Sequence, residues 1–490
     1  MNVRQGTARC KWVLWQSVLP AVLALAGCTV GPNYVPPQTA TPPTWHSQLR
    51  DGLVAGNAGK TDPNVLASWW TTLKDPVLSG LIERAVAGNL DLKHAQARIR
   101  EARARRQATR GSLFPTLDAT SSATWSRSGG RGTPTVSTEA YAANFDAAWE
   151  LDLFGGIRRS VEAAQANLEA REGDLRDTLV SLLAETALNY VEVRTYQARL
   201  AAAEASLKTQ EETYELTLWR SQAGLGDELD IQQARYNLEN TRAQMPPLRT
   251  GLEEAMNRIA VLLGETPGSI HAQLEKPEPV PVPPAQVAVG IPADVVRRRP
   301  DIRRTERELA AQTARVGAAT ADLYPRLFLN GSVGLETLSL GNPGSGSWLL
   351  SGGPRLSLPI FNTTIRPNIE IQSALQEQAL LQYETTVLDA LEEVENALVA
   401  YAQEQQRRDN LREATTAAQA AVTLAQNKYE TGLVDFTTVL IAERSLLSFQ
   451  DQLNQSNGTV TSNLIRLYKA LGGGWTSMVA ASAAPVGQQP

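Results

Sequence analysis

The sequence predicts a mixed α/β membrane protein, internally duplicated, with strands that belong to a β-barrel shared among subunits and long helices that pack as coiled coils. Three observations predict this fold. Short motifs recur about 208 residues apart, four segments alternate between apolar and polar residues, and two stretches carry heptad patterns too long for a compact domain.

Composition excludes several classes of partner and site. With 46 basic and 51 acidic residues the net charge is −5, so no basic excess favours nucleic acid. Outside the N-terminus, no run of about 18 apolar residues offers a membrane-spanning helix. Three histidines and two cysteines leave too few ligands for a His/Cys metal site or a disulfide framework.

An enzyme is also not expected. No Ser or Cys lies in a nucleophile-elbow motif with a plausible His, and we expect His94 on a helix and His271 in a linker, both at the surface. We therefore expect no catalytic residue, no cofactor and no metal.

Residues 1–27 are interpreted as a lipoprotein signal peptide. A positively charged start precedes an apolar stretch, which ends in Leu25-Ala26-Gly27-Cys28. Small residues before a cysteine resemble the bacterial lipobox, so we expect Cys28 to carry an N-acyl diglyceride and a palmitate; an ordinary signal peptide with an incidental cysteine is the alternative. Thr29 replaces the Asp that would resemble an inner-membrane retention signal, which favours the outer membrane.

The rest of the chain contains two copies of one unit. Gly224-Leu225-Gly226-Asp227 matches Gly432-Leu433-Val434-Asp435 at an offset of 208, and Phe114-Pro115 matches Tyr324-Pro325 at an offset of 210. The predicted division is an acylated extended segment (28–66), a first repeat (67–275), a Pro-rich connector (276–290), a second repeat (291–474) and a disordered tail (475–490).

Heptad spacing predicts the helices. From Leu179 to Tyr214 every seventh residue is apolar except Thr186. From Leu380 to Tyr401 a series that alternates by four and three is apolar except at Glu384. A helix from about 159 to 222 would reach roughly 95 Å, so we expect coiled-coil packing. A solvated rod is the alternative for these helices alone.

Strict alternation predicts four strands, at about 113–127, 139–154, 324–337 and 348–361. In the second segment Tyr141, Phe145 and Trp149 share the apolar face. A soluble two-sided sheet is the alternative, but strands of this length with aromatic residues on the apolar side are typical of outer-membrane barrels. Four strands cannot close a barrel, so subunits must share it, and three copies would supply about 12 strands.

A family resemblance rests on three motifs: Cys28-Thr29-Val30-Gly31-Pro32-Asn33-Tyr34, Arg298-Arg299-Pro300-Asp301-Ile302 and Tyr429-Glu430-Thr431-Gly432-Leu433. Together with the duplication, they resemble the TolC-like outer-membrane factors, specifically the lipoprotein (NodT-type) subgroup that serves resistance–nodulation–division tripartite efflux systems. The resemblance implies a homotrimer with a 12-stranded barrel in the outer membrane and a helical tunnel in the periplasm.

This resemblance implies a function and partners. The chain would be the exit duct that passively conducts small molecules, such as drugs or toxic compounds, from a periplasmic adaptor and an inner-membrane pump to the exterior. An exit channel for type I protein secretion is the alternative, because nothing in these residues separates the classes of cargo.

The resemblance also implies a site at the helical tips. Adaptor contact falls on the two turns, and a plain interhelical turn is the alternative reading of these residues: Gly224, Leu225, Gly226, Gly432, Leu433 and Val434. The periplasmic gate falls on Tyr429, Glu430, Ile441 and Arg444. Related members carry an acid at the position of Ile441 and a base at that of Glu430, so Glu443, Asp227, Glu228 and Asp230 are candidate partners for Arg444 or Arg235. Solvated helix faces are the alternative for these charges.

The polar faces of the strands predict an acidic lumen. The expected lumen-facing acids are Asp118, Asp146, Glu150, Asp152 and Glu336. Arg326 and Arg355 leave the balance negative, which would favour cations in transit.

Overall fold

The computed structural model describes residues 29–38, 41–50, 52–55, 66–338 and 346–475. The chain forms two compact units. Unit 1 comprises Met1–Gln38, Ala97–Glu172 and Arg304–Glu384, and unit 2 comprises Thr39–Gln96, Gly173–Arg303 and Thr385–Pro490. The predicted signal peptide, Cys28 and most of the expected tail lie outside the described residues. No helix within the described ranges is both long and apolar enough to cross a bilayer.

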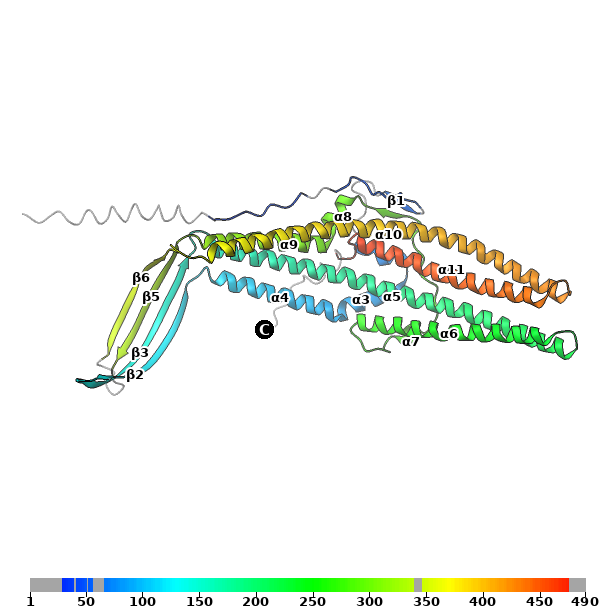
Figure 1. The fold of residues 1–490 in the computed structure, drawn as a ribbon, viewed down its shortest axis with the longest axis horizontal. Coiled ribbons are helices and arrows are strands. Elements are labelled where there is room, and N and C mark those ends of the chain that lie inside the picture. Colours follow the sequence, from blue (N-terminus) through cyan, green and yellow to red (C-terminus); the bar gives the residue numbers. More distant parts are fainter. Residues whose placement is uncertain (1–28, 39–40, 51, 56–65, 339–345, 476–490) are drawn as a thin grey trace, which may run out of the picture. The chain divides into compact units, whose positions relative to one another are not determined.

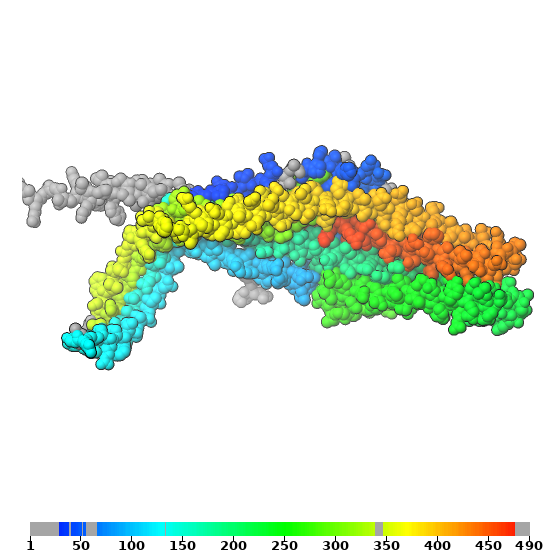
Figure 2. All heavy atoms as spheres, viewed as in Figure 1, coloured from blue at the N-terminus to red at the C-terminus, as the bar shows by residue number. Residues whose placement is uncertain are grey.

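Unit 1 contains an antiparallel four-stranded sheet in the order β2-β3-β5-β6 (Figure 1). Its strands are β2 (Thr116–Gly130), β3 (Thr133–Leu151), β5 (Arg326–Thr337) and β6 (Ser347–Ser357). The strands form a thin layer, and no helix covers the face in view (Figure 2).

The strand ends differ from the expected ones for local reasons. β2 and β5 begin directly after Pro115 and Pro325, because proline has no N–H to donate to a ladder. β3 begins at Thr133 rather than near 139, because the β2–β3 ladder continues to the pair Gly130–Thr133. The connection is therefore a tight hairpin, with Gly132 at φ +93°.

The register gives the sheet one apolar and one polar face. Phe145 lies opposite Ala119 on one side and Val333 on the other, and Val333 in turn lies opposite Leu350. Side chains on this face remain exposed, as for Trp348 at 75 % and Leu350 at 69 %. Large apolar side chains that face outward on an uncovered sheet are unfavourable in water, so this face requires an apolar environment.

Four long helices contribute residues to both units: α4 (Leu90–Gly111), α5 (Gly156–Gln222), α9 (Pro300–Ala321) and α10 (Ile365–Glu430). In unit 1, α5 packs on α9 through small residues, because Ala166, Ala310 and Ala311 form one buried cluster. An ion pair between Arg307 and Glu169 (3.5 Å) joins the same two helices.

Arg159 of α5 holds the extended segment that starts at Thr29. Its guanidinium donates to the carbonyl of Val30 (3.2 Å) and to Asn33 Oδ1 (2.7 Å), and the Val30 N–H donates to the Phe154 carbonyl (3.1 Å). Gly31 fits because a Cβ there would lie 2.4 Å from Gly317 Cα. The first residue after Cys28 is thereby held beside the start of α5.

Unit 2 holds the main hydrophobic core. The elements not yet named are η1 (Trp69–Leu73), α3 (Pro76–Gly88), α6 (Glu228–Leu262), α7 (His271–Leu274), α8 (Pro292–Arg298) and α11 (Phe436–Ala470). A small parallel sheet pairs β1 (Leu53–Ala55) with β4 (Val287–Val289). Strand β4 is the extended end of the Pro-rich connector, which the sequence did not predict as a strand. His271, expected in a linker, begins the short helix α7 and contacts Glu253.

The duplication extends to single hydrogen bonds. Gly224 and Gly432 lie 208 positions apart, have φ +73° and +71°, and donate to the carbonyls of Ser221 and Tyr429. Gly264 and Gly472 repeat this arrangement at the ends of α6 and α11, with φ +75° and +72°. Each is a helix C-terminus closed by a left-handed glycine.

A buried arginine ties α5 to the connector in unit 2. Arg194, only 1 % exposed, donates to the Lys276 carbonyl (2.9 Å), to Glu278 Oε2 (3.0 Å) and to Tyr190 Oη (3.1 Å). Its fork of donors satisfies backbone and side-chain acceptors at once, so the connector is held by specific bonds rather than by its prolines alone.

We predict that Arg194→Met lowers the stability of unit 2. The substitution removes a charged donor from the Lys276 carbonyl, from Glu278 and from the buried Tyr190 hydroxyl, which costs about 2–3 kcal/mol. The temperature of loss of helical circular dichroism would fall. Arg412→Met is the matched control, because Arg412 is exposed and its ion pair among the described residues is with Asp409 on its own helix. Equal effects of the two variants would contradict the prediction.

Candidate functional site

The two helix-hairpin turns, α5–α6 and α10–α11, lie at the same end of unit 2 (Figure 1). Gly224 and Gly432 have room for a Cβ, so their positive φ, not crowding, is what requires glycine. The turns present apolar side chains to solvent, since Leu225 is 70 % and Leu433 74 % exposed. Each turn therefore exposes one leucine side chain at the same relative position.

The remaining turn residues have structural roles that fit a reversal of the chain. Asp227 caps α6, since its carboxylate accepts from the Leu229 N–H (3.5 Å), and Asp435 takes the equivalent N-cap position of α11. Gly226 is partly buried, and a Cβ there would lie 3.3 Å from the Ser221 nitrogen. Val434 is partly buried and precedes the second cap.

Tyr429 anchors an aromatic and cationic cluster next to the second turn. Its ring lies 5.3 Å from that of Phe436, and the Arg220 guanidinium lies 4.6 Å from the Tyr429 centroid. A cavity of about 220 Å³ adjoins Tyr429, Phe436 and the exposed Glu430. The cluster joins the end of α5 to both helices of the second hairpin; sequence reasoning missed Arg220, which no motif marks.

Glu443 does not pair with Arg444. It is 5 % exposed, and its Oε1 accepts from Thr213 and from Gln426, each at 3.3 Å. Its other oxygen has no hydrogen-bond partner among the described residues. Burial raises the pKa of Glu443, and the two donors offset this only in part. The candidate gate acid is therefore a buried carboxyl among neutral groups.

Arg444 instead lies over Tyr236 and donates to its hydroxyl (3.1 Å). Tyr236 was missed by sequence reasoning, although it lies 208 positions before Arg444 and the duplication could have marked it. Arg235 and Ile441 are both exposed. Within the described chain, neither Asp227, Glu228 nor Asp230 forms an ion pair with either arginine.

Four of the five expected lumen acids lie on the polar face of the sheet. Asp118 lies directly opposite Asp146, which accepts from Thr120 (2.8 Å) and Ser332 (2.7 Å). Glu150 and Glu336 share this face by register. Asp152 does not join them: it follows the end of β3, and its carboxylate accepts from the Ile157 and Arg158 N–H groups at the start of α5.

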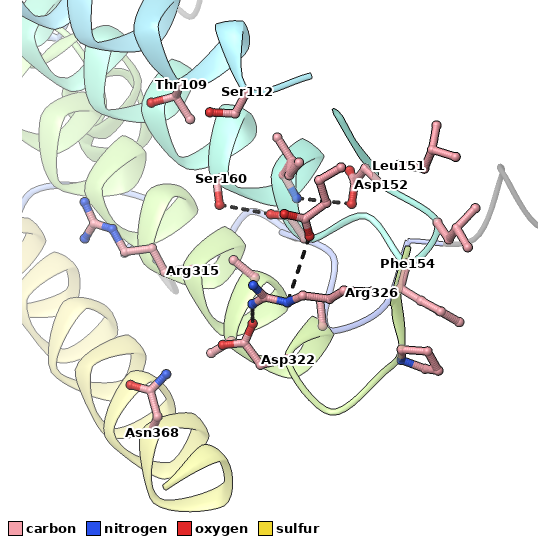
Figure 3. Close-up of a pocket in the computed structure, with 18 of the residues that line it drawn as sticks. Thr109, Ser112, Leu151, Asp152, Phe154, Ser160, Arg315, Asp322, Arg326 and Asn368 are labelled. Atoms are coloured by element: carbon pink, nitrogen blue, oxygen red, sulfur yellow. Dashed lines mark hydrogen bonds and ion pairs between the residues drawn. The ribbon is translucent and has the colours of Figure 1, made fainter. Parts of the chain in front are cut away.

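A pocket of about 690 Å³ lies in unit 1 where strands give way to helices. Arg326 there points toward Asp322, and its Nε lies 3.9 Å from Glu150 (Figure 3). Thr109, Ser160, Arg315 and Asn368 add polar groups from four helices. The described residues include no group of three His, Cys, Asp or Glu arranged to hold a metal ion. The pocket offers charged and polar surface, not a catalytic arrangement.

Comparison with known proteins identifies the family. The sequence model described as "Outer membrane efflux protein" matches residues 81–265 and 291–473, one match in each half. Nodulation protein T of Rhizobium leguminosarum bv. trifolii is 34 % identical over 438 residues, which cover 88 % of this chain and 91 % of that protein.

Two further relatives extend the likeness. The toluene efflux pump outer membrane protein TtgI of Pseudomonas putida is 33 % identical over 471 residues, 93 % of this chain and 97 % of its own. The solved structure of the outer-membrane channel OprN superposes with a TM-score of 0.84 at 37 % identity, covering 91 % of this chain and all of that one. With its TolC-like fold and two matched halves, the chain belongs to the outer membrane efflux protein family, whose members are channels and not enzymes.

Proposed function

We propose that the chain forms, as a homotrimer, the exit duct of a tripartite efflux pump, in which three four-stranded sheets close a 12-stranded barrel and the helices continue it as a tunnel. The observation that carries this proposal is a sheet with an exposed apolar face, a charged face and two edge strands, β2 and β6, that have no strand partner among the described residues. Unpaired backbone groups are not tolerated in lipid, and a closed barrel removes every edge.

The N-terminal segment supports a lipid anchor at the membrane surface. Thr29 packs against Gly155, and Val30 pairs with Phe154, just beyond the end of β3. In this proposal the acyl chains on Cys28 would insert into the periplasmic leaflet of the outer membrane, beside the end of the sheet that joins the helices. Two or more acyl chains anchor a protein stably, since each buried CH₂ contributes about 0.8 kcal/mol.

The exposed turns support docking of a periplasmic adaptor. Leu225 and Leu433 are two similarly exposed apolar side chains in each chain. A trimer would therefore present about six of them around one opening. An inner-membrane pump, in this proposal one of the resistance–nodulation–division class, would deliver cargo through that adaptor. The toluene efflux named for a relative favours small molecules as cargo over secreted proteins.

We predict three chains per particle for the mature, acylated protein in detergent. Closure of the barrel requires strands from several copies, because one chain supplies four. Size-exclusion chromatography with light scattering measures the protein mass independently of bound detergent. A monomer that stays soluble without detergent would contradict both the trimer and the membrane barrel.

We predict that the channel prefers cations and that Asp118→Asn with Asp146→Asn weakens this preference. Asp152 caps a helix and is not counted here. The polar face then carries four acidic residues and two arginines, Arg326 and Arg355, so its net charge is negative. Reversal potentials across a KCl gradient in planar bilayers would shift toward zero in the double variant. Glu139→Gln is the control, since Glu139 lies on β3 but on the other face. Anion preference in the wild type would contradict the prediction.

We predict that Glu443 makes the tip sensitive to pH. Because its folded pKa is raised above the ordinary value near 4.5, the tip is most stable at low pH, and this stability is lost as the pH rises through the raised pKa. A less stable tip would open more readily, so the conductance of the channel would increase as the pH rises through the raised pKa of Glu443. Glu443→Gln, which stays neutral, would remain at the low-pH conductance throughout.

The control for this experiment is Glu239→Gln, which removes an exposed acid of α6 that pairs with Arg242. It should keep the wild-type response to pH. A Glu443→Gln channel that still responds like the wild type would show that another group governs the change.

A further inference from the structure

The sheet order determines which helices border the next subunit. Strands β2 and β6 are the free edges; α4 leads into β2, and α10 follows β6. Within the chain, β3 pairs with β5, so the helices α5 and α9 that adjoin these strands pack together. If β6 pairs with β2 of another copy, α10 meets α4 in the same way that α5 meets α9.

The duplication makes this correspondence residue by residue. From α5 to α10 the offset is 208, and the matches are Ile157 with Ile365, Arg158 with Arg366, Glu162 with Glu370, Ala166 with Ala374 and Glu169 with Glu377. From α4 to α9 the offset is 210, and the matches are Asp91 with Asp301, Ala104 with Ala314, Arg105 with Arg315 and Pro115 with Pro325. The α5–α9 contact is therefore a template for an α10–α4 contact between subunits.

The template contact is centred on small residues. Ala166 packs against Ala310, and Glu162 and Glu169 lie about one turn away on either side of Ala166. Both carboxylates are paired within unit 1. Glu162 accepts from Arg159 (2.8 Å), and Glu169 pairs with Arg307 (3.5 Å).

In the copy of this contact, the small residue on one side is replaced by a cation. Ala374 stands for Ala166, with Glu370 and Glu377 on either side, while Arg100 of α4 stands for Ala310. Arg100, Glu370 and Glu377 are all exposed, and none has a hydrogen-bond or ionic partner among the described residues. Two carboxylates and one guanidinium are thus left unpaired at matching positions.

The surrounding charge is complementary as well. From Ala97 to its end, α4 carries six arginines and one glutamate: Arg98, Arg100, Glu101, Arg103, Arg105, Arg106 and Arg110. The part of α10 in unit 1 carries one arginine and three glutamates: Arg366, Glu370, Glu377 and Glu384. The apolar side chains of Ile371 and Leu381, 56 % and 54 % exposed, lie on the same part of α10, and contact with a second helix would bury them.

We propose that Arg100 of one subunit inserts between Glu370 and Glu377 of a second copy of this chain, opposite Ala374. The inference rests on the proposed trimer and identifies the contact that sets its subunit register. The interface is head-to-tail, so the same contact repeats until the ring closes. A planar guanidinium can donate to both carboxylates at once, which fixes the position of one helix along the other.

The test is a charge swap. Arg100→Glu places three acids together, so the trimer band on unheated gels should be lost at a temperature at which the wild-type band persists. Glu370→Arg with Glu377→Arg should have the same effect, because three cations then meet. Combining all three substitutions should restore the band toward the wild-type temperature. Failure of the triple variant to recover would overturn the proposal.

Arg105→Glu is the matched control. It makes the same change of charge on α4, but about 140° around the helix axis from Arg100, toward the groove that it lines with Ala163 and Arg171. It should leave the dissociation temperature unchanged. An equal loss in Arg105→Glu would mean that the basic helix acts through its total charge, as in binding to anionic lipid headgroups, and would overturn the specific contact.

A cross-linking arm does not depend on the stability of the swapped variants. Arg100→Cys with Ala374→Cys should give covalent dimers and trimers with a mild oxidant, reversed by a reductant, whereas Arg105→Cys with Ala374→Cys should give none. A wild-type protein that is monomeric in detergent would overturn the trimer itself. A wild-type trimer that neither loses its band in Arg100→Glu nor cross-links through residues 100 and 374 would overturn this contact alone.

Discussion

Two unpaired strand edges on a two-faced sheet are the constraint on which the rest of the molecule depends. Each edge, β2 and β6, leaves a row of backbone donors and acceptors without strand partners among the described residues. The apolar face requires lipid, where such groups cost several kcal/mol each. In the proposed barrel, both requirements are met when the edge strands pair with those of other copies. Assembly of the proposed trimer would then follow from the sheet itself.

The junction between sheet and helices in unit 1 is built from local chemistry. Prolines 115 and 325 set where two strands begin, and Asp152 caps α5 directly after β3 ends. Arg159 then fixes the segment that begins at Thr29. These contacts bring the end of β3, the start of α5 and the segment that begins at Thr29 together at one place in unit 1.

Most of the fold could be predicted from periodicity, because alternation and heptads report burial on one face of an element. The four strands and the long helices follow from such patterns. The pairing of β1 with β4 could not be predicted, since three-residue strands carry no period. Nor could the sequence tell that Asp152 caps a helix, whereas Asp146 lies on the open polar face; both fit the same alternation. Burial of Glu443 depends on Thr213 and Gln426, which come from two other helices.

The positions at which the two halves differ are the informative ones. Where both halves serve the same structural purpose, they agree down to the φ of Gly224 and Gly432. Where matching positions have different surroundings in the two repeats, the residues at these positions differ. Ala310 packs inside the chain, and its counterpart Arg100 is exposed on the edge helix. Arg235 is exposed near one turn, and its counterpart Glu443 is buried.

The divergence between Ala310 and Arg100 has a physical rationale in the proposed ring. A duplicated chain begins with identical contacts at its internal and intersubunit junctions, so a ring could close with its halves slipped by one repeat. A charge present at one kind of junction and absent from the other makes the slipped arrangement costly, because the arginine would face alanine packing instead of two carboxylates. Arg100 would therefore distinguish the α10–α4 junction between chains from the α5–α9 junction within a chain. The backbone alone does not distinguish these two junctions.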